Sequence, residues 1–200
     1  MSVDIRVAKV GDAEGILQIY APFCESTRVS FEVVAPSVEE MRDRIKRIGV
    51  TYPWLVAEEA RRILGYVYAS RLRERAAYQW TVEVAVYVAP EHQRRGLARA
   101  LYTSLFAILR TQGYFTAFAG VTLPNAASVG VHEKLGFRPA GVFTGVGYKT
   151  GRWLDVGWWQ REIQPPFDEP PDPRPFPAVC GDSAVASALS EGVRLANRSH

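Results

Sequence analysis

The strongest structural signal in this chain is a run of strand-forming residues that changes, after a proline, into a long helical pattern. Valine, threonine and aromatic residues dominate positions 78–88, and Pro90 stops the run. Apolar residues then recur at helical spacing from Leu97 to Leu109, and Gly113 ends the pattern. We therefore predict a central strand that a short basic loop joins to a helix of residues 96–112.

Strands and helices are also predicted on both sides of this unit. Residues 4–9 alternate like a strand and precede a helix that begins near Asp12, and Ser37 with Glu40 forms a capping box for a helix that ends at Gly49. The remaining elements are a hairpin at 54–58 and 63–70, a strand at 115–121, a helix at 126–135 and a hairpin at 137–149 and 153–160. This order predicts a mixed α/β domain over residues 1–163.

Residues 164–200 differ in composition from the rest of the chain. They carry seven of the 13 prolines, which excludes a regular helix or strand from the proline-rich part and predicts an extended arm. Residues 183–196 are expected to form a short helix with Val185, Leu189, Val193 and Leu195 turned inward. We expect this tail to be a loosely attached appendage.

Composition excludes several classes of protein. No apolar run approaches the roughly 20 residues that span a bilayer, and the first residues do not resemble a secretory signal, so we expect a cytoplasmic protein without a membrane role. Two distant cysteines and three histidines suggest neither a disulfide framework nor a metal site. The net charge of +3 suits an anionic small molecule as easily as nucleic acid, and no dense basic stripe favours nucleic acid.

The loop before the long helix is suited to binding an anion. It consists of Gln93-Arg94-Arg95-Gly96-Leu97-Ala98. Free backbone N–H groups at a helix start point outward together, and the helix dipole adds partial positive charge there. Because glycine lets a ligand approach the main chain closely, we expect Gly96 to admit a pyrophosphate.

A carboxylate interrupts the central strand. Val82, Val84 and Val86 are expected on one face, and Thr81, Glu83, Ala85 and Tyr87 on the other. A carboxylate within an apolar strand is costly unless it faces a cavity or a partner. Glu83 therefore either lines a site or forms a structural ion pair with a neighbouring arginine.

Two motifs in order resemble the GCN5-related N-acetyltransferase (GNAT) family. The first is the 93–98 loop, and the second is Asn125 followed by Glu133-Lys134-Leu135-Gly136-Phe137. The resemblance covers roughly residues 4–163 and implies a mostly antiparallel central sheet flanked by helices, with acetyl-CoA as cosubstrate and no metal. By this resemblance, the residues that bind acetyl-CoA are Val86, Tyr87, Val88, Arg94, Arg95, Gly96, Leu97, Ala98, Arg99, Asn125 and Ser128.

Four further segments narrow the resemblance. Residues 52–58, 78–83, 123–125 and 147–157 look like the phosphinothricin acetyltransferase group. This implies acetylation of the α-amine of a small amino acid such as phosphinothricin, methionine sulfoximine or methionine sulfone. The alternatives are a protein or peptide N-acetyltransferase of the same family, a non-catalytic acyl-CoA sensor, and a nucleic-acid-binding module.

The resemblance also assigns candidate catalytic residues. An amine must lose a proton before it attacks a thioester, and Glu83 is the candidate base, acting directly or through water. His132 stands where many family members have a tyrosine that protonates the leaving thiolate. A histidine can donate or accept near neutral pH, so the sequence leaves open whether His132 acts as acid, as relay or as a structural residue.

The acceptor site is expected on loops and on the last hairpin. Arg71, Arg73 and Arg75 alternate before Tyr78, and we expect Arg71 and Arg75 to bind the carboxylate of the substrate. Phe31, Tyr78 and Tyr148 complete the predicted substrate contacts. Tryptophans at 153, 158 and 159 give the hairpin apolar surface, and in relatives it contributes to a dimer, so a homodimer is expected.

Overall fold

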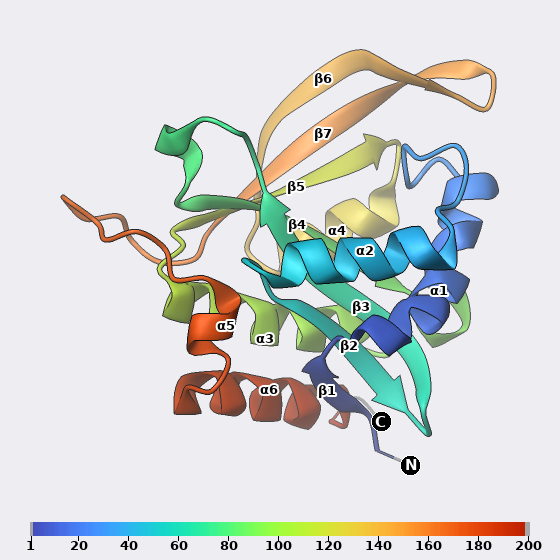
Figure 1. Cartoon of the computed structure of the whole chain (residues 1–200). Helices are drawn as coiled ribbons and strands as arrows, with labels where there is room; N and C mark the ends of the chain where they lie inside the picture. Colours follow the sequence, from blue (N-terminus) through green and yellow to red (C-terminus); the bar gives the residue numbers. More distant parts are fainter. Residues whose placement is uncertain (1, 199–200) are drawn as a thin grey trace.

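The computed structural model describes residues 2–198, and a seven-stranded sheet forms its centre (Figure 1). The strand order is β1-β2-β3-β4-β5-β7-β6, and every pairing is antiparallel except that of β4 with β5. The strands are β1 (Asp4–Val7), β2 (Trp54–Glu59), β3 (Arg62–Arg71), β4 (Thr81–Val88), β5 (Thr116–Leu123), β6 (Arg138–Lys149) and β7 (Arg152–Glu162). The expected mixed α/β fold with a mostly antiparallel sheet is confirmed.

Helices cover both faces of this sheet. They are α1 (Ala13–Glu25), α2 (Val38–Gly49), α3 (Leu97–Gln112), α4 (Ala126–Lys134), α5 (Phe176–Val179) and α6 (Ser183–Ala196). Strand alternation separates two cores: Leu55 and Ala57 of β2 pack with α3 and α6, whereas Trp54 and Val56 pack with α1 and α2. None of the helices within residues 2–198 is long and apolar enough to cross a membrane.

Strand β4 lies in the middle of the sheet, as its composition predicts, but it begins later than expected. Residues Ala76–Tyr78 form a 3-10 turn, so Tyr78 lies before the strand, which starts at Thr81. The predicted alternation is confirmed. Val82 and Val84 are buried in the core beside α3, while Glu83 and Tyr87 face a cavity on the other side.

The strands β4 and β5 diverge after a short parallel contact. They pair only from Thr81 with Thr116 to Glu83 with Phe118, although both strands continue for several residues. Beyond Glu83, the backbone N–H and C=O groups of β4 that point toward β5 therefore have no hydrogen-bond partner in that strand. This opening between the two strands makes the space in which the candidate site lies.

The tail is not a loose appendage, and that expectation is wrong. Val185, Ala188 and Ala196 of α6 are buried in the core that α3 shares with the sheet. The hydroxyl of Ser104 in α3 donates to the carbonyl of Ala188, 2.8 Å away. The predicted helix at 183–196 is confirmed, and its apolar side covers the outward face of α3.

The proline-rich segment also contains a short helix that was not expected. α5 forms because Pro175 and Pro177 stand at its start, where a missing backbone N–H costs no helical hydrogen bond. The side chain of Gln112 donates to the carbonyls of Thr51 and Arg174, which ties this segment to the body. The prolines exclude long regular structure here without excluding ordered packing.

Candidate active site

A cavity of about 430 Å³ opens between the diverging ends of β4 and β5. Residues 29–32, from the segment between α1 and α2, form one wall, and residues of β6 and β7 form another. The predicted site residues in its lining are Phe31, Glu83, Val86, Tyr87, Asn125, Ser128 and His132. The fold thus brings both predicted catalytic residues into one cavity.

Glu83 is the last residue of β4 that pairs with β5, so its side chain lies where the two strands separate. The side chain is half-buried, and none of the residues in the described part of the chain gives it a hydrogen bond or an ion pair. Burial raises the pKa of the Glu83 carboxyl above its usual value, and the positive charge of Arg73 partly opposes this rise. Such a carboxylate can accept a proton from a group inside the cavity.

Arg73 lies beside the site, although it is exposed and is not among the residues that line the cavity. Its guanidinium lies 6.0 Å from the ring centroid of Trp158, which lines the cavity. Arg71 instead pairs with Glu74 at 2.8 Å on the surface. The lining contains neither Arg71 nor the other predicted substrate residues Arg75, Tyr78 and Tyr148.

The difference between these arginines has a simple cause. Residues 72–80 form an irregular loop with one 3-10 turn, so the alternation that holds within a strand does not hold there. Arginine spacing along this loop consequently gives no information about which guanidinium faces the cavity.

His132 is buried and both of its ring nitrogens are engaged. Nδ1 lies 2.8 Å from the carbonyl oxygen of Ser128, which can only accept, so Nδ1 carries a proton. Nε2 lies 3.0 Å from the hydroxyl of Tyr102. Burial lowers the pKa of His132, so the ring is neutral and Nε2 accepts the hydroxyl proton of Tyr102.

The start of α3 has the geometry of an anion site. Gly96 is the N-cap residue with φ of +80°, a conformation that glycine adopts without strain. The N–H of Ala100 donates to the carbonyl of Gly96, so the earlier N–H groups of the helix have no acceptor within it. Val88, the last residue of β4, and residues 94–99, which follow that strand along the chain, lie outside the cavity lining.

The arginines before this helix differ in environment. Arg94 and Arg99 are exposed, whereas Arg95 lies 3.0 Å from His92 Nδ1 and 3.8 Å from Glu59. Arg94 and Arg99 are therefore free to approach a phosphate group, while Arg95 is held against the end of the β2–β3 hairpin.

Asn125 begins α4 as predicted. Its side-chain oxygen accepts the N–H of Ser128 at 3.1 Å, which confirms the capping role. Asn125 and Ser128 also line the cavity, so the amide N–H₂ of Asn125 is available to a ligand there. Capping and ligand binding are compatible for this residue.

Several cavity residues were not predicted from the sequence. They include Tyr20, Glu32, Tyr68, Gly120, Thr122 and Phe143, which come from five different parts of the chain. Burial and the nearby charge of Glu83 raise the pKa of Tyr68 to about 12, so its hydroxyl stays protonated. Only the alternation of Tyr66 and Tyr68 on β3 could have identified Tyr68, because the other five residues meet through tertiary packing.

Within residues 2–198, no group of three or more His, Cys, Asp or Glu side chains is arranged to hold a metal ion.

Comparison with known proteins connects this geometry to acetyl transfer. The family model described as an acetyltransferase (GNAT) domain matches residues 5–158. A phosphinothricin N-acetyltransferase from Streptomyces viridochromogenes is 40% identical over 177 residues, which are 88% of this chain and 94% of the relative. An L-methionine sulfoximine/L-methionine sulfone acetyltransferase from Pseudomonas aeruginosa is 35% identical over 174 residues, covering 85% of this chain and 100% of that protein.

A solved structure shows the same arrangement of elements. It is a GNAT superfamily phosphinothricin acetyltransferase from Sinorhizobium meliloti in complex with acetyl-CoA. The TM-score is 0.79 at 31% identity, and the match covers 88% of this chain and 99% of that one.

Proposed function

The chain belongs to the GNAT acetyltransferase family and is an acetyl-CoA-dependent N-acetyltransferase, and from this premise we propose that its acceptor is a small α-amino acid. The proposed acceptors are phosphinothricin, methionine sulfoximine and methionine sulfone, which the names of its relatives contain. The observation that carries the proposal is that Glu83 lines the cavity while Arg73, whose positive charge acts on the Glu83 carboxyl, lies beside it. A carboxylate that can take a proton and a guanidinium that can bind a carboxylate suit the two ends of an α-amino acid.

The residues present fit acetyl-CoA. The free N–H groups at the start of α3, together with Arg94 and Arg99, suit its pyrophosphate. The edge of β4 beyond Glu83 leaves backbone groups of Val86 and Val88 without a β5 partner, which suits an extended amide-containing chain. When bound, acetyl-CoA supplies an activated thioester carbonyl.

Glu83 is the proposed general base. It accepts a proton from the ammonium group of the acceptor, directly or through one water, and leaves a neutral amine that can form the new bond from nitrogen to the acetyl carbon. Bond formation leaves one further proton on the nitrogen, and this second proton would pass to the sulfur as the carbon–sulfur bond breaks, so that the leaving group departs as a neutral thiol. The raised pKa of Glu83 favours this role because a weakly basic carboxylate would hold the proton poorly.

His132 is assigned a positioning role rather than a proton-transfer role. Its two ring nitrogens are bound to Ser128 and Tyr102, which supports a neutral imidazole that fixes α4 against α3. The side chains of Asn125 and Ser128 on α4 are thereby held at the cavity wall.

We also propose that the chain forms a dimer and that its acetyltransferase domain ends at residue 163. The β6–β7 hairpin extends beyond the rest of the sheet (Figure 1) and exposes Val142, Phe143, Val146 and Trp153. We assign this apolar surface to contact with a second copy of the chain. Residues 1–163 are the proposed acetyltransferase domain and residues 164–200 its extension, of which the described part, residues 164–198, packs on the domain. Sedimentation of wild type and Trp153→Asp tests the dimer, which the substitution should dissociate.

The experiment that tests the function is release of free thiol from acetyl-CoA. Wild type, Glu83→Gln and the control Glu162→Gln, an exposed carboxylate of β7, are compared on the three amino acids and on a basic peptide. We expect amino-acid-dependent release that falls about 10²- to 10⁴-fold in Glu83→Gln and is unchanged in the control.

Two results would contradict the proposal in different ways. Acetylation of the peptide alone would leave the family assignment intact and replace the substrate class. Binding of acetyl-CoA without thiol release from any acceptor would instead favour an acyl-CoA sensor.

A further inference from the structure

The segment of residues 26–34 forms a wall of the cavity, although it has no regular secondary structure. It follows α1, and its residues Val29–Glu32 line the cavity beside Glu83. Irregular segments at a binding site are usually mobile unless tertiary contacts fix them. The contacts that hold this segment therefore determine the shape of the part of the cavity proposed to bind the acceptor.

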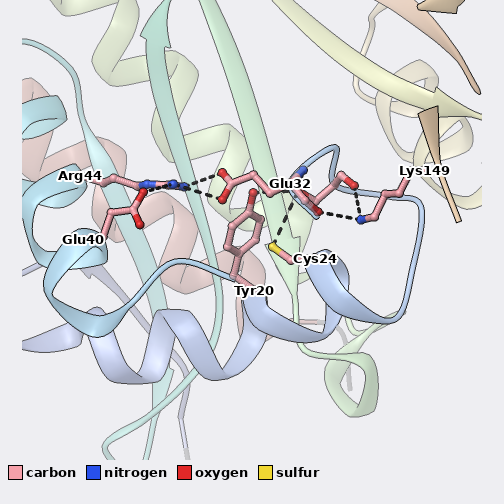
Figure 2. Close-up of polar contacts among 7 residues, drawn as sticks. Tyr20, Cys24, Glu32, Glu40, Arg44 and Lys149 are labelled. Carbon is pink, nitrogen blue, oxygen red and sulfur yellow. Dashed lines mark hydrogen bonds and ion pairs between the residues drawn. The ribbon is translucent and has the colours of Figure 1, made fainter. Parts of the chain in front are cut away.

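Lys149, the last residue of β6, supplies the main contact from the sheet (Figure 2). Its Nζ donates to the carbonyl of Ser30 at 2.7 Å and to the carbonyl of Glu32 at 2.8 Å. A third carbonyl, that of Phe23 in α1, lies 3.5 Å away. An ammonium has three donors, and these three carbonyls match them.

The ammonium of Lys149 is an unusual group to bury. Lys149 is only 6% exposed, and no carboxylate of residues 2–198 lies within ion-pair distance of it. Burial of a charge is costly unless its hydrogen bonds are satisfied, so the carbonyl dipoles must remain turned toward Nζ. The charge of Lys149 and the backbone conformation of residues 30–32 are consequently coupled.

Contacts from the helices hold the same segment from the opposite side. Arg44 of α2 binds both carboxylate oxygens of Glu32, at 2.6 and 3.1 Å (Figure 2). The hydroxyl of Tyr20 in α1 lies 2.8 Å from that of Ser30. Lys149 thus joins the β6–β7 hairpin to a segment that α1 and α2 already anchor.

Packing between these contacts leaves little freedom. The ring of Phe31 lies against Gly147, two residues before Lys149. A Cβ atom at position 147 would be 2.3 Å from this ring. A change at Lys149 would therefore move the Phe31 side of the cavity and leave the start of α3 in place.

We propose that Lys149 is a positioning residue for the acceptor, which holds residues 29–32 closed against the cavity by binding the carbonyls of Ser30 and Glu32. It touches no reacting atom, and its effect reaches the acceptor through Phe31 and Glu32. The expected effect of Lys149 on kinetics rests on the proposed function. Its expected effect on the conformation of residues 26–34 rests on the structure alone.

The test compares Lys149→Met with Arg152→Met, its matched control. Arg152 faces Lys149 in the hairpin register and is exposed, so both variants lose one cation from the same place. Hydrogen–deuterium exchange of residues 26–34 is measured without substrate, and we expect exchange about tenfold faster in Lys149→Met only. In the thiol-release assay, we expect KM for the amino acid to rise about tenfold while KM for acetyl-CoA stays within about twofold.

The outcomes separate this proposal from the proposed function. Unchanged exchange at 26–34 overturns the positioning role, and so does a KM change that affects acetyl-CoA as much as the acceptor. If wild type acetylates none of the amino acids, the proposed function fails, and the exchange measurement still decides the role of Lys149. Should Lys149→Met fold poorly, Lys149→Gln, which keeps N–H donors but loses the charge, serves in the same two measurements.

Discussion

Glu83 lowers the stability of the folded state because its carboxylate is half-buried and without a partner among the described residues. Its pKa is raised above the value of 4.5 that applies to the unfolded chain. The folded state therefore binds the proton more tightly, and stability is greatest below that value and declines as pH rises through the folded pKa. The same rise predicts that kcat falls as acid protonates Glu83, at a pH above 4.5.

Glu83→Gln removes this pH dependence. We expect the variant to be more stable than wild type at neutral pH, by less than about 2 kcal/mol, and equally stable at pH 4. Urea unfolding at the two pH values measures the difference. Equal stability at neutral pH would mean that the carboxylate has a partner in solution.

Tyr102 and His132 form a buried hydrogen-bonded pair whose role a single substitution can decide. Tyr102→Phe leaves Nε2 of His132 without its donor, and an unsatisfied buried acceptor costs about 1–3 kcal/mol. If the pair is structural, the free energy of unfolding falls by that amount while kcat changes less than about threefold. A large loss of kcat with unchanged stability would show that the pair moves a proton.

The N-terminus of α3 is the element on which acetyl-CoA binding is expected to depend. Gly96→Ala places a Cβ on a residue with φ of +80°, which costs about 1–2 kcal/mol. The turn should open and raise KM for acetyl-CoA, with KM for the acceptor nearly unchanged. This is the reverse of the pattern expected for Lys149→Met, so the two variants measured together show whether the two substrates use separate parts of the site.

Helix α6 approaches α3 closely at a glycine. A Cβ at Gly192 would lie 2.1 Å from Oγ of Ser104 and 3.2 Å from the carbonyl of Ala100. Because Ser104 also donates to Ala188, its hydroxyl cannot move away freely, and Gly192→Ala should destabilise by about 1–3 kcal/mol. Gly49→Ala, in open space at the end of α2, is the control and should be neutral or slightly stabilising. Thermal unfolding of both variants provides the comparison.

At the scale of the whole molecule, the periodicity of the sequence predicted those features that depend only on residues close together in the chain. Alternation in β4 placed Glu83 opposite Val82, and turn residues gave both hairpins, because these follow from the strand period. The wall of the cavity could not be predicted in this way. Lys149 and Ser30 are 119 residues apart, and no periodicity relates them. The tail was misjudged because prolines limit regular structure without preventing packing on α3.

The C-terminal extension should support folding without contributing to chemistry. Most of the surface of α3 is buried, because the sheet covers one side of the helix and α6 covers the other. Leu101 and Ser104 are both buried, and Ser104 lies against α6. The side chain of Asn197 exchanges two hydrogen bonds with the backbone of Val3, which joins the two ends of the described chain. None of residues 164–198 lines the cavity.

Deletion of residues 183–200 therefore should lower the unfolding midpoint strongly and promote aggregation, since it exposes the apolar side of α3. Asn197→Ala is the matched point change and should cost only about 1–2 kcal/mol, because it removes hydrogen bonds and no apolar burial. Thiol release at low temperature, where the shortened chain stays folded, should give KM values like those of the full chain. Normal stability with altered kinetics would reverse the assignment and make α6 part of the catalytic machinery.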